Sequence, residues 1–435
     1  MTTGKARGRR GRRGRRSVVL PVVSVTALAL ATACGGSSSS NGSSPSGGSA
    51  GTVHFAALAP LTGSFASLGA PIVEGTKTAA AVINAAGGIL GKKLVIDPVD
   101  TKGDPADAVT ALNQETALNS PAALIGPVTL EIHGVQPLFD RNQIPDGWQG
   151  GSAEFDHNTD PYLWRCNPSD SQEGVAIAAY AISKGYTRAA MLFTTSAATQ
   201  TFEPIISSIY KRLGGQIVAT QSITAGLSSY RSEVQNIISS HPQVIFTQME
   251  AGTAATAFRN FQQLGGLNVP FIGTDLMAGS DVIKAVGPSL SKAHMVEVQG
   301  SNALTGSAGA FTKVYEKVNG HAPDSGASFA YDCTIDFALA ITKAHSFSGT
   351  AITQQMMAVS NPPGVQVSDY ATAVKDLKKG IKINYQGVSG PLDFNSNHNV
   401  TGAWDVVQAT GSKAGDVTVM HTITGAQIEQ ALSGG

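Results

Sequence analysis

Three polar residues stand directly after apolar runs that are typical of buried strands, and they indicate a site that binds rather than catalyses. Thr129 follows the run at 122–125, where a helix would begin, so the free amides beside it would attract an anion such as a carboxylate. Glu250 and Asp275 follow the runs at 244–247 and 269–272. An acid beyond a buried strand needs a partner. The alternatives are that Thr129 and Asp275 only cap helices.

Other reactive residues show no arrangement that would support catalysis or hold a metal or cofactor. The nine histidines are scattered, without HExxH or CxxC spacing, and there is no phosphate-binding GxxxxGK run. A GxSxG sequence at 47–51 lies in a Gly/Ser-rich segment, where the strand and helix that flank a serine nucleophile cannot form. The sequence therefore predicts a binding protein with no cofactor, no metal site and no enzymatic activity.

Strands and helices alternate along the chain. The first unit has a strand at 53–58, a helix at 70–86 closed by glycines, and a strand at 92–99, after which Asp104 and Pro105 open the next helix. Further strands are predicted at 122–125, 162–165, 189–193, 217–221, 244–247, 269–272 and 294–298, with helices such as 130–142, 172–184, 201–213 and 253–264. This pattern predicts doubly wound α/β sheets, in a chain long enough for two domains.

Four motifs in the first unit resemble those of one family. PLTG, INAAGG, GKKL and GDPADAV occur in that order between residues 60 and 109, and they are similar to the leucine/isoleucine/valine-binding family, the type I solute-binding proteins of ABC importers. The runs at 329–341 and 388–402 resemble its crossover helix and hinge-proximal turn. The resemblance implies two doubly wound α/β lobes joined by a multi-strand hinge. Lobe 1 would comprise 53–165 and about 299–345; lobe 2 would comprise 166–298 and about 346–435, with the hinge-crossing C-terminal segment.

The resemblance also implies ligand contacts on the first lobe. Leu130 stands where the family has the serine of a carboxylate-binding loop, with Thr129 one residue before it. Gly150 and Ser152 align with the loop that holds the ammonium and carboxylate groups. Leu68, after the first turn, is a further candidate contact. Trp148 could line the pocket or pack in the core.

On the second lobe the resemblance implies that Asp275 pairs with a ligand ammonium group. Thr199 stands where a tyrosine is usual, and Glu250 lies where family members often have tyrosines. The loss of two tyrosines and the gain of an acid favour a ligand more polar than leucine. Cys166 and Cys333, both expected near the hinge, could form a disulfide or remain two buried thiols, because sequence cannot supply the Cα separation that a bridge requires.

The N-terminal region has the features of an export signal. Residues 1–16 carry eight basic residues, 17–33 are apolar and small, and Cys34 follows as in a lipobox. Residues 1–33 are therefore predicted to be a signal peptide. Cys34 is predicted to be lipidated, at the start of a Gly/Ser tether at 34–52. An ordinary signal peptide, an uncleaved anchor and twin-arginine export are alternatives. Without the leader, 22 basic residues face 30 acidic ones, which argues against nucleic-acid binding.

Together these features predict a substrate-binding lipoprotein on the outer face of the cytoplasmic membrane. It would bind an amino acid or a similar small polar zwitterion or amide in the cleft between the lobes, and deliver it to an ABC permease and its ATPase. A surface receptor that senses a ligand through the same fold is the alternative, and an enzyme on this fold is a third.

Overall fold

The computed structural model describes residues 51–63, 65–196, 199, 202–301, 308–324, 326–413 and 416–433. The predicted signal peptide, Cys34 and the tether up to residue 50 lie outside the described residues. Within the described residues, no helix combines the length and the apolar character needed to cross a bilayer.

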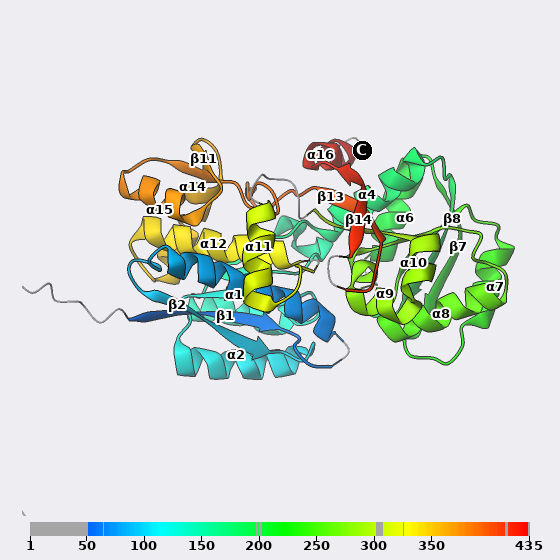
Figure 1. The fold of residues 1–435 in the computed structure, drawn as a ribbon, viewed down its shortest axis with the longest axis horizontal. Coiled ribbons are helices and arrows are strands. Elements are labelled where there is room, and N and C mark those ends of the chain that lie inside the picture. Colours follow the sequence, from blue (N-terminus) through cyan, green and yellow to red (C-terminus); the bar gives the residue numbers. More distant parts are fainter. Residues whose placement is uncertain are drawn as a thin grey trace, which may run out of the picture. The chain divides into compact units, whose positions relative to one another are not determined.

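The first sheet has five parallel strands in the order β2-β1-β3-β4-β5, of which β1 and β2 are labelled in Figure 1. Their bounds are β1 Thr52–Ala59, β2 Lys93–Asp100, β3 Ala123–Ile125, β4 Asp146–Trp148 and β5 Leu163–Arg165. Successive side chains of β1 enter different cores, because strand side chains alternate between faces. Phe55, Ala57 and Ala59 pack in one cluster, and Ala56 and Leu58 pack in another. Helices therefore cover both faces of this sheet.

The second sheet has seven strands in the order β14-β13-β10-β9-β8-β6-β7. Their bounds are β6 Arg188–Thr194, β7 Gln216–Ile223, β8 Val244–Gln248, β9 Phe271–Gly273, β10 Met295–Gly300, β13 Trp404–Ala409 and β14 Val417–Ile423. The first five are parallel, whereas β13 and β14 continue the sheet antiparallel. Met191 and Leu192 on β6 again enter two different cores. The predicted α/β class is confirmed, with an antiparallel edge that was not predicted.

Helices connect these strands and cover the sheets. Their bounds are α1 Ala66–Ala85, α2 Pro105–Asn119, α3 Ile132–Asn142, α4 Asp170–Ser183, α6 Phe202–Arg212, α7 Arg231–Ser239, α8 Ala251–Gln263, α9 Ser280–Val286, α10 Pro288–His294, α11 Ala308–Asn319, α12 Ala327–Ala344, α13 Gly349–Thr353, α14 Met356–Ser360, α15 Tyr370–Lys378 and α16 Gly425–Ser433, with 3-10 turns at Ala153–His157 and Asp275–Ala278. Asp104 caps α2 as predicted, since its side chain accepts the N–H groups of Ala106 and Asp107.

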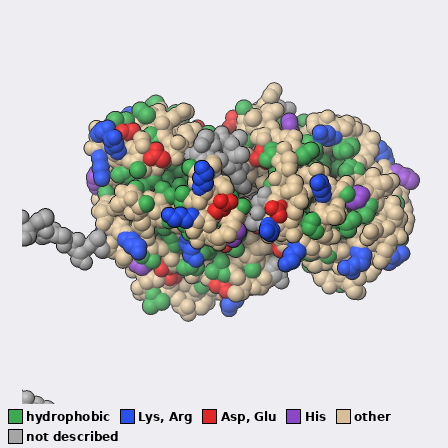
Figure 2. Space-filling model, viewed as in Figure 1, with side chains coloured by type: hydrophobic (Ala, Val, Ile, Leu, Met, Phe, Trp, Pro, Cys, Tyr) green, Lys and Arg blue, Asp and Glu red, His purple; other side chains and the backbone are tan. Residues whose placement is uncertain are grey.

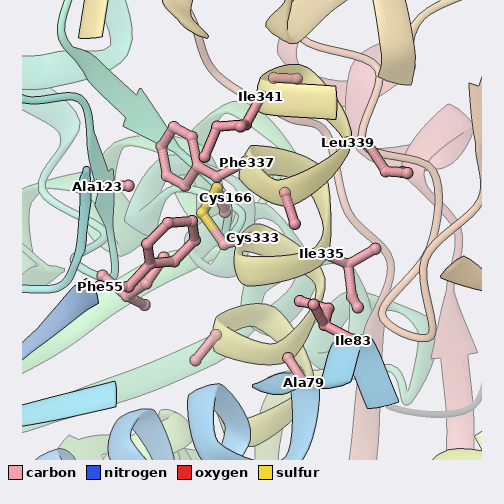
Figure 3. Close-up of a cluster of buried hydrophobic side chains, with 14 of the residues drawn as sticks. Phe55, Ala79, Ile83, Ala123, Cys166, Cys333, Ile335, Phe337, Leu339 and Ile341 are labelled. Carbon is pink, nitrogen blue, oxygen red and sulfur yellow. A yellow bond between two sulfur atoms is a disulfide. The ribbon is translucent and has the colours of Figure 1, made fainter. Parts of the chain in front are cut away.

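Helix α12 forms the centre of the core beside the first sheet. Figure 3 shows Ile335, Phe337, Leu339 and Ile341 of this helix among side chains of α1 and the sheet. Cys333 on the same helix is joined by a disulfide to Cys166, which follows β5. Of the two alternatives for these cysteines, the structure has the bridge, and it ties the chain where it leaves the first sheet to this buried helix.

The segment after α12 packs differently from the expected arrangement. Residues about 346–435 were expected in lobe 2, yet Ile352, Val359, Tyr370 and Ile383 belong to the core beside the first sheet. The segment also holds a small parallel sheet of β11 (Val365–Val367) and β12 (Ile383–Tyr385). Only β13, β14 and α16 pack with the second sheet or its helices. Apolar residues of α13, α14 and α15 pack in the same core as α12. This packing keeps the segment with the first sheet rather than with the second.

Candidate functional site

A pocket lies beyond the carboxyl ends of strands from both sheets, where α/β proteins usually bind ligands. It contains about 1290 Å³ of empty space, including its opening to solvent. On the side of the first sheet it is lined by the start of α1 and by the loops after β3 and β4. On the other side it is lined by the start of α4 and by residues after β8 and β9. Of the nine predicted contacts, the lining includes Leu68, Thr129, Leu130, Gly150, Glu250 and Asp275.

The wall beside the first sheet offers backbone donors. The hydrogen bonds among the described residues leave the N–H groups of Thr129, Leu130 and Gly150 without an acceptor. The loop reaches the pocket through Gly126, which has a φ of +94° and whose Cβ would come within 1.9 Å of the Leu58 carbonyl oxygen. Unpaired amides at the end of a strand are suited to hold a carboxylate group.

Helix α3 begins later than predicted, and this changes the part assigned to Thr129. The residue before the helix is Glu131, and α3 starts at Ile132 rather than near Leu130. The Glu131 carboxylate accepts the Thr101 hydroxyl at 2.6 Å and the Val128 N–H at 3.1 Å. Burial raises the pKa of Glu131 to about 7, although these hydrogen bonds act to lower it. Thr129 is therefore not the helix cap, although it does line the pocket.

The loop after β4 is held by a buried arginine. The Arg165 guanidinium donates to the carbonyl oxygens of Gly151 at 3.3 Å and Ser152 at 3.1 Å, and it pairs with Asp156. Ser152 is fully buried and donates to Glu154 at 3.1 Å, so it is outside the lining of the pocket. The predicted hydroxyl contact at Ser152 is thus not available in this structure, whereas the adjacent Gly150 faces the pocket.

Trp148 and Thr199 also lie outside the pocket lining. Trp148 is fully buried and packs edge-to-face on Phe155, with ring centroids 4.7 Å apart, so of its two alternatives the core position is observed. Trp148 points to the same face of β4 as Asp146, and it packs in the core cluster on that face. Thr199 is buried; its hydroxyl accepts the Ser196 N–H at 3.0 Å and donates to the Thr194 carbonyl. It stabilises a turn.

The wall beside the second sheet presents carboxylates. Glu250 accepts the Thr194 hydroxyl at 3.2 Å, while its other carboxylate oxygen is buried without a partner. Asp275 lines the open pocket, and its side chain retains accessible surface there. The surrounding protein still desolvates its carboxylate, and this raises the pKa of Asp275 to about 6. A hydrogen bond from the Leu276 backbone opposes this rise. Neither acid caps the following helix through its side chain.

Helix α4 brings further acids that sequence reasoning missed. The Asp275 N–H donates to Glu173 at 2.7 Å. Burial, followed by repulsion from Asp275 and Asp170, raises the pKa of Glu173 well above its usual range. Among the described residues, the lining holds six acids and no Lys, Arg or His; the acids are Asp170, Glu173, Glu250, Asp275, Asp281 and Asp324. Glu173 had no sequence signal beyond its place in the helix predicted at 172–184, and Asp170 stood just before that helix.

Comparison with known proteins agrees with this architecture. Residues 52–416 match the family model described as periplasmic binding protein. Leu/Ile/Val-binding protein homolog 3 of Brucella melitensis is 44% identical over 62 residues, which span 14% of this chain and only 17% of that relative.

Two solved structures share the fold. One is the leucine binding protein LivK from Thermotoga maritima, with a TM-score of 0.72 and 18% identity over 86% of this chain and 99% of that one. The other is an ABC transporter solute binding protein from R. palustris in complex with benzoate, with a TM-score of 0.69 and 18% identity over 86% and 97%. The matched family consists of binding proteins rather than enzymes. With the family model covering most of its length, this chain belongs to the periplasmic binding protein family.

Proposed function

We propose that this protein is the extracytoplasmic solute-binding component of an ABC importer, which binds an amino acid or a similar small zwitterion and delivers it to a permease. In this proposal Cys34 carries a lipid that anchors the protein to the outer face of the cytoplasmic membrane. The family membership and the basic, apolar leader before Cys34 support this role.

The observation that carries the proposal is the contrast between the two walls of the pocket. Unpaired backbone N–H groups at Thr129, Leu130 and Gly150 suit a carboxylate, and the Asp275 carboxylate opposite them suits an ammonium group. Charge-assisted hydrogen bonds of both kinds are strong in a site that excludes water. An α-amino acid carries both groups on one carbon atom.

The same contrast argues against a ligand that is only an anion. The R. palustris relative was solved with benzoate, a carboxylate without a cationic group. Such a ligand could bind the backbone N–H groups on the wall beside the first sheet. It would leave the acids on the wall beside the second sheet without a counter-charge. On the face shown in Figure 2, the described Lys and Arg side chains are scattered rather than gathered in one patch.

Calorimetry with a panel of the common amino acids, benzoate and simple amides would test this function. We expect saturable binding of at least one L-amino acid, and much weaker binding of the matching amine and of the matching carboxylic acid. Binding of benzoate in preference to every amino acid would contradict the proposal.

A further inference from the structure

Two of the acids on the second wall occupy separate positions. Strands β6 and β9 flank β8 on opposite sides. Glu250, after β8, is hydrogen-bonded to Thr194 at the end of β6. Asp275, after β9, is bonded through its N–H group to Glu173 on α4. Neighbouring strands lie about 4.8 Å apart, so the two carboxylates are of the order of one to two strand spacings apart. One ammonium group held by Asp275 would therefore leave Glu250 for another group of the ligand.

The pocket lining contains buried acceptors without donors, Glu250 among them. The side chain of Gln248 is 3% exposed, lines the pocket, and its Oε1 atom has no hydrogen-bond partner. One carboxylate oxygen of Glu250 is in the same condition, as is Oδ1 of Asn167, which also lines the pocket. Because an unpaired buried acceptor is costly, this region favours a ligand group that donates several hydrogen bonds.

The charge of the lining separates a cationic donor from a neutral one. An amide group could donate to Gln248, but it would not compensate the Glu250 carboxylate. With no Lys, Arg or His among the described lining residues, the compensating charge has to come from the ligand.

We infer that the ligand is a dibasic amino acid, whose terminal ammonium or guanidinium group is held by Glu250 and Gln248 while Asp275 holds its α-ammonium group. This inference rests on the proposed function, because it names the class of amino acid that the same pocket selects.

Calorimetry with matched ligands on the folded mature protein tests the inference. L-lysine and L-norleucine have chains of equal length that differ in the terminal charge, and L-ornithine and L-glutamine compare a cation with an amide. We expect lysine to bind at least tenfold more tightly than norleucine, and ornithine more tightly than glutamine. In Glu250→Gln the ratio of lysine affinity to norleucine affinity should fall below about threefold. Glu429→Gln, which removes an exposed carboxylate on α16 outside the pocket, is the matched control and should keep the wild-type preference.

The outcomes distinguish this inference from the function on which it rests. Norleucine or leucine binding as tightly as lysine, glutamine binding as tightly as ornithine, or an unchanged preference in Glu250→Gln would each overturn the dibasic ligand and leave an amino-acid-binding protein. Failure of every amino acid to bind would overturn both. Circular dichroism and thermal unfolding of Glu250→Gln establish that a changed preference does not come from a loss of folding.

Discussion

Replacing Asp275 by asparagine should weaken amino-acid binding strongly and in a pH-dependent way. The change keeps the size of the side chain and removes the negative charge opposite the amide wall. Truncating one partner of a buried, hydrogen-bonded charge pair costs about 2–5 kcal/mol, which corresponds to roughly thirtyfold to several thousandfold in affinity. The fold should be little affected, because the Asp275 N–H bond to Glu173 comes from the backbone and remains.

The pKa of Asp275 sets where this effect should disappear. Since it is raised to about 6, the wild-type carboxylate is charged at pH 8 and mostly protonated at pH 5. Wild-type affinity should therefore fall as the pH drops through 6, while that of Asp275→Asn should change less. The other carboxyl groups on elements packed against this residue are present in both proteins, so the comparison at each pH cancels their titration; they are Asp170, Glu173, Glu250, Asp281 and Glu297.

Calorimetry between pH 5 and 8, with the amino acid that binds best, is the assay. Asp281→Asn is the matched control, because Asp281 also lines the pocket but its carboxylate accepts the N–H of Val282 in α9. The affinity of Asp281→Asn for the ligand should change less than about threefold if Asp275 acts by direct contact with the ligand. A similar loss in both variants would instead indicate a long-range electrostatic effect of the acids in the pocket. Equal losses in the two variants, or wild-type affinity in Asp275→Asn at pH 8, would refute the reasoning.

Three further predictions concern anchoring and stability. Cys34→Ala should release the protein from the membrane or leave its precursor uncleaved in a fractionation experiment, and normal processing with full membrane retention would contradict lipidation. Replacing both Cys166 and Cys333 by alanine should lower the free energy of unfolding by about 2–5 kcal/mol in denaturant titrations, because the bridge closes a long loop with a sequence separation of 167; an unchanged midpoint would count against this. Burial raises the pKa of Glu297 to about 8. The folded state therefore retains a proton that the unfolded state releases above about pH 4.5, and the free energy of unfolding should fall as the pH rises from 4.5 to 8. Glu297→Gln should flatten that decline in unfolding measurements, and an identical slope in the variant would show that Glu297 is not its source.

The first unit of the fold could be predicted closely because its signals are local. The strand predicted at 53–58 is β1 at Thr52–Ala59, and the helix predicted at 70–86 is α1 at Ala66–Ala85. Gly87 and Gly88 both have positive φ after that helix, as the closing glycines required. Alternating apolar residues and helix caps act within a few positions of the chain, so sequence alone can reveal them.

The contents of the pocket were harder to predict because they depend on side-chain direction and on distant segments. Trp148, Gly150 and Ser152 lie within five residues of one another, yet only Gly150 faces the pocket. Trp148 ends β4 and packs on Phe155, and Arg165 binds the carbonyl groups of Gly151 and Ser152 in the following loop; neither contact follows from alignment to a motif. Glu173 lies in the pocket lining, where its carboxylate accepts the N–H of Asp275 from the 3-10 turn at Asp275–Ala278; this is a tertiary contact without a local signal.

A crystal structure of the protein with its tightest-binding amino acid tests the central claim most directly. We expect the ligand in this pocket, with its carboxylate within hydrogen-bond distance of backbone N–H groups at Thr129, Leu130 or Gly150 and its α-ammonium group on Asp275. A ligand bound outside the pocket, or one whose carboxylate faces the second wall, would contradict it.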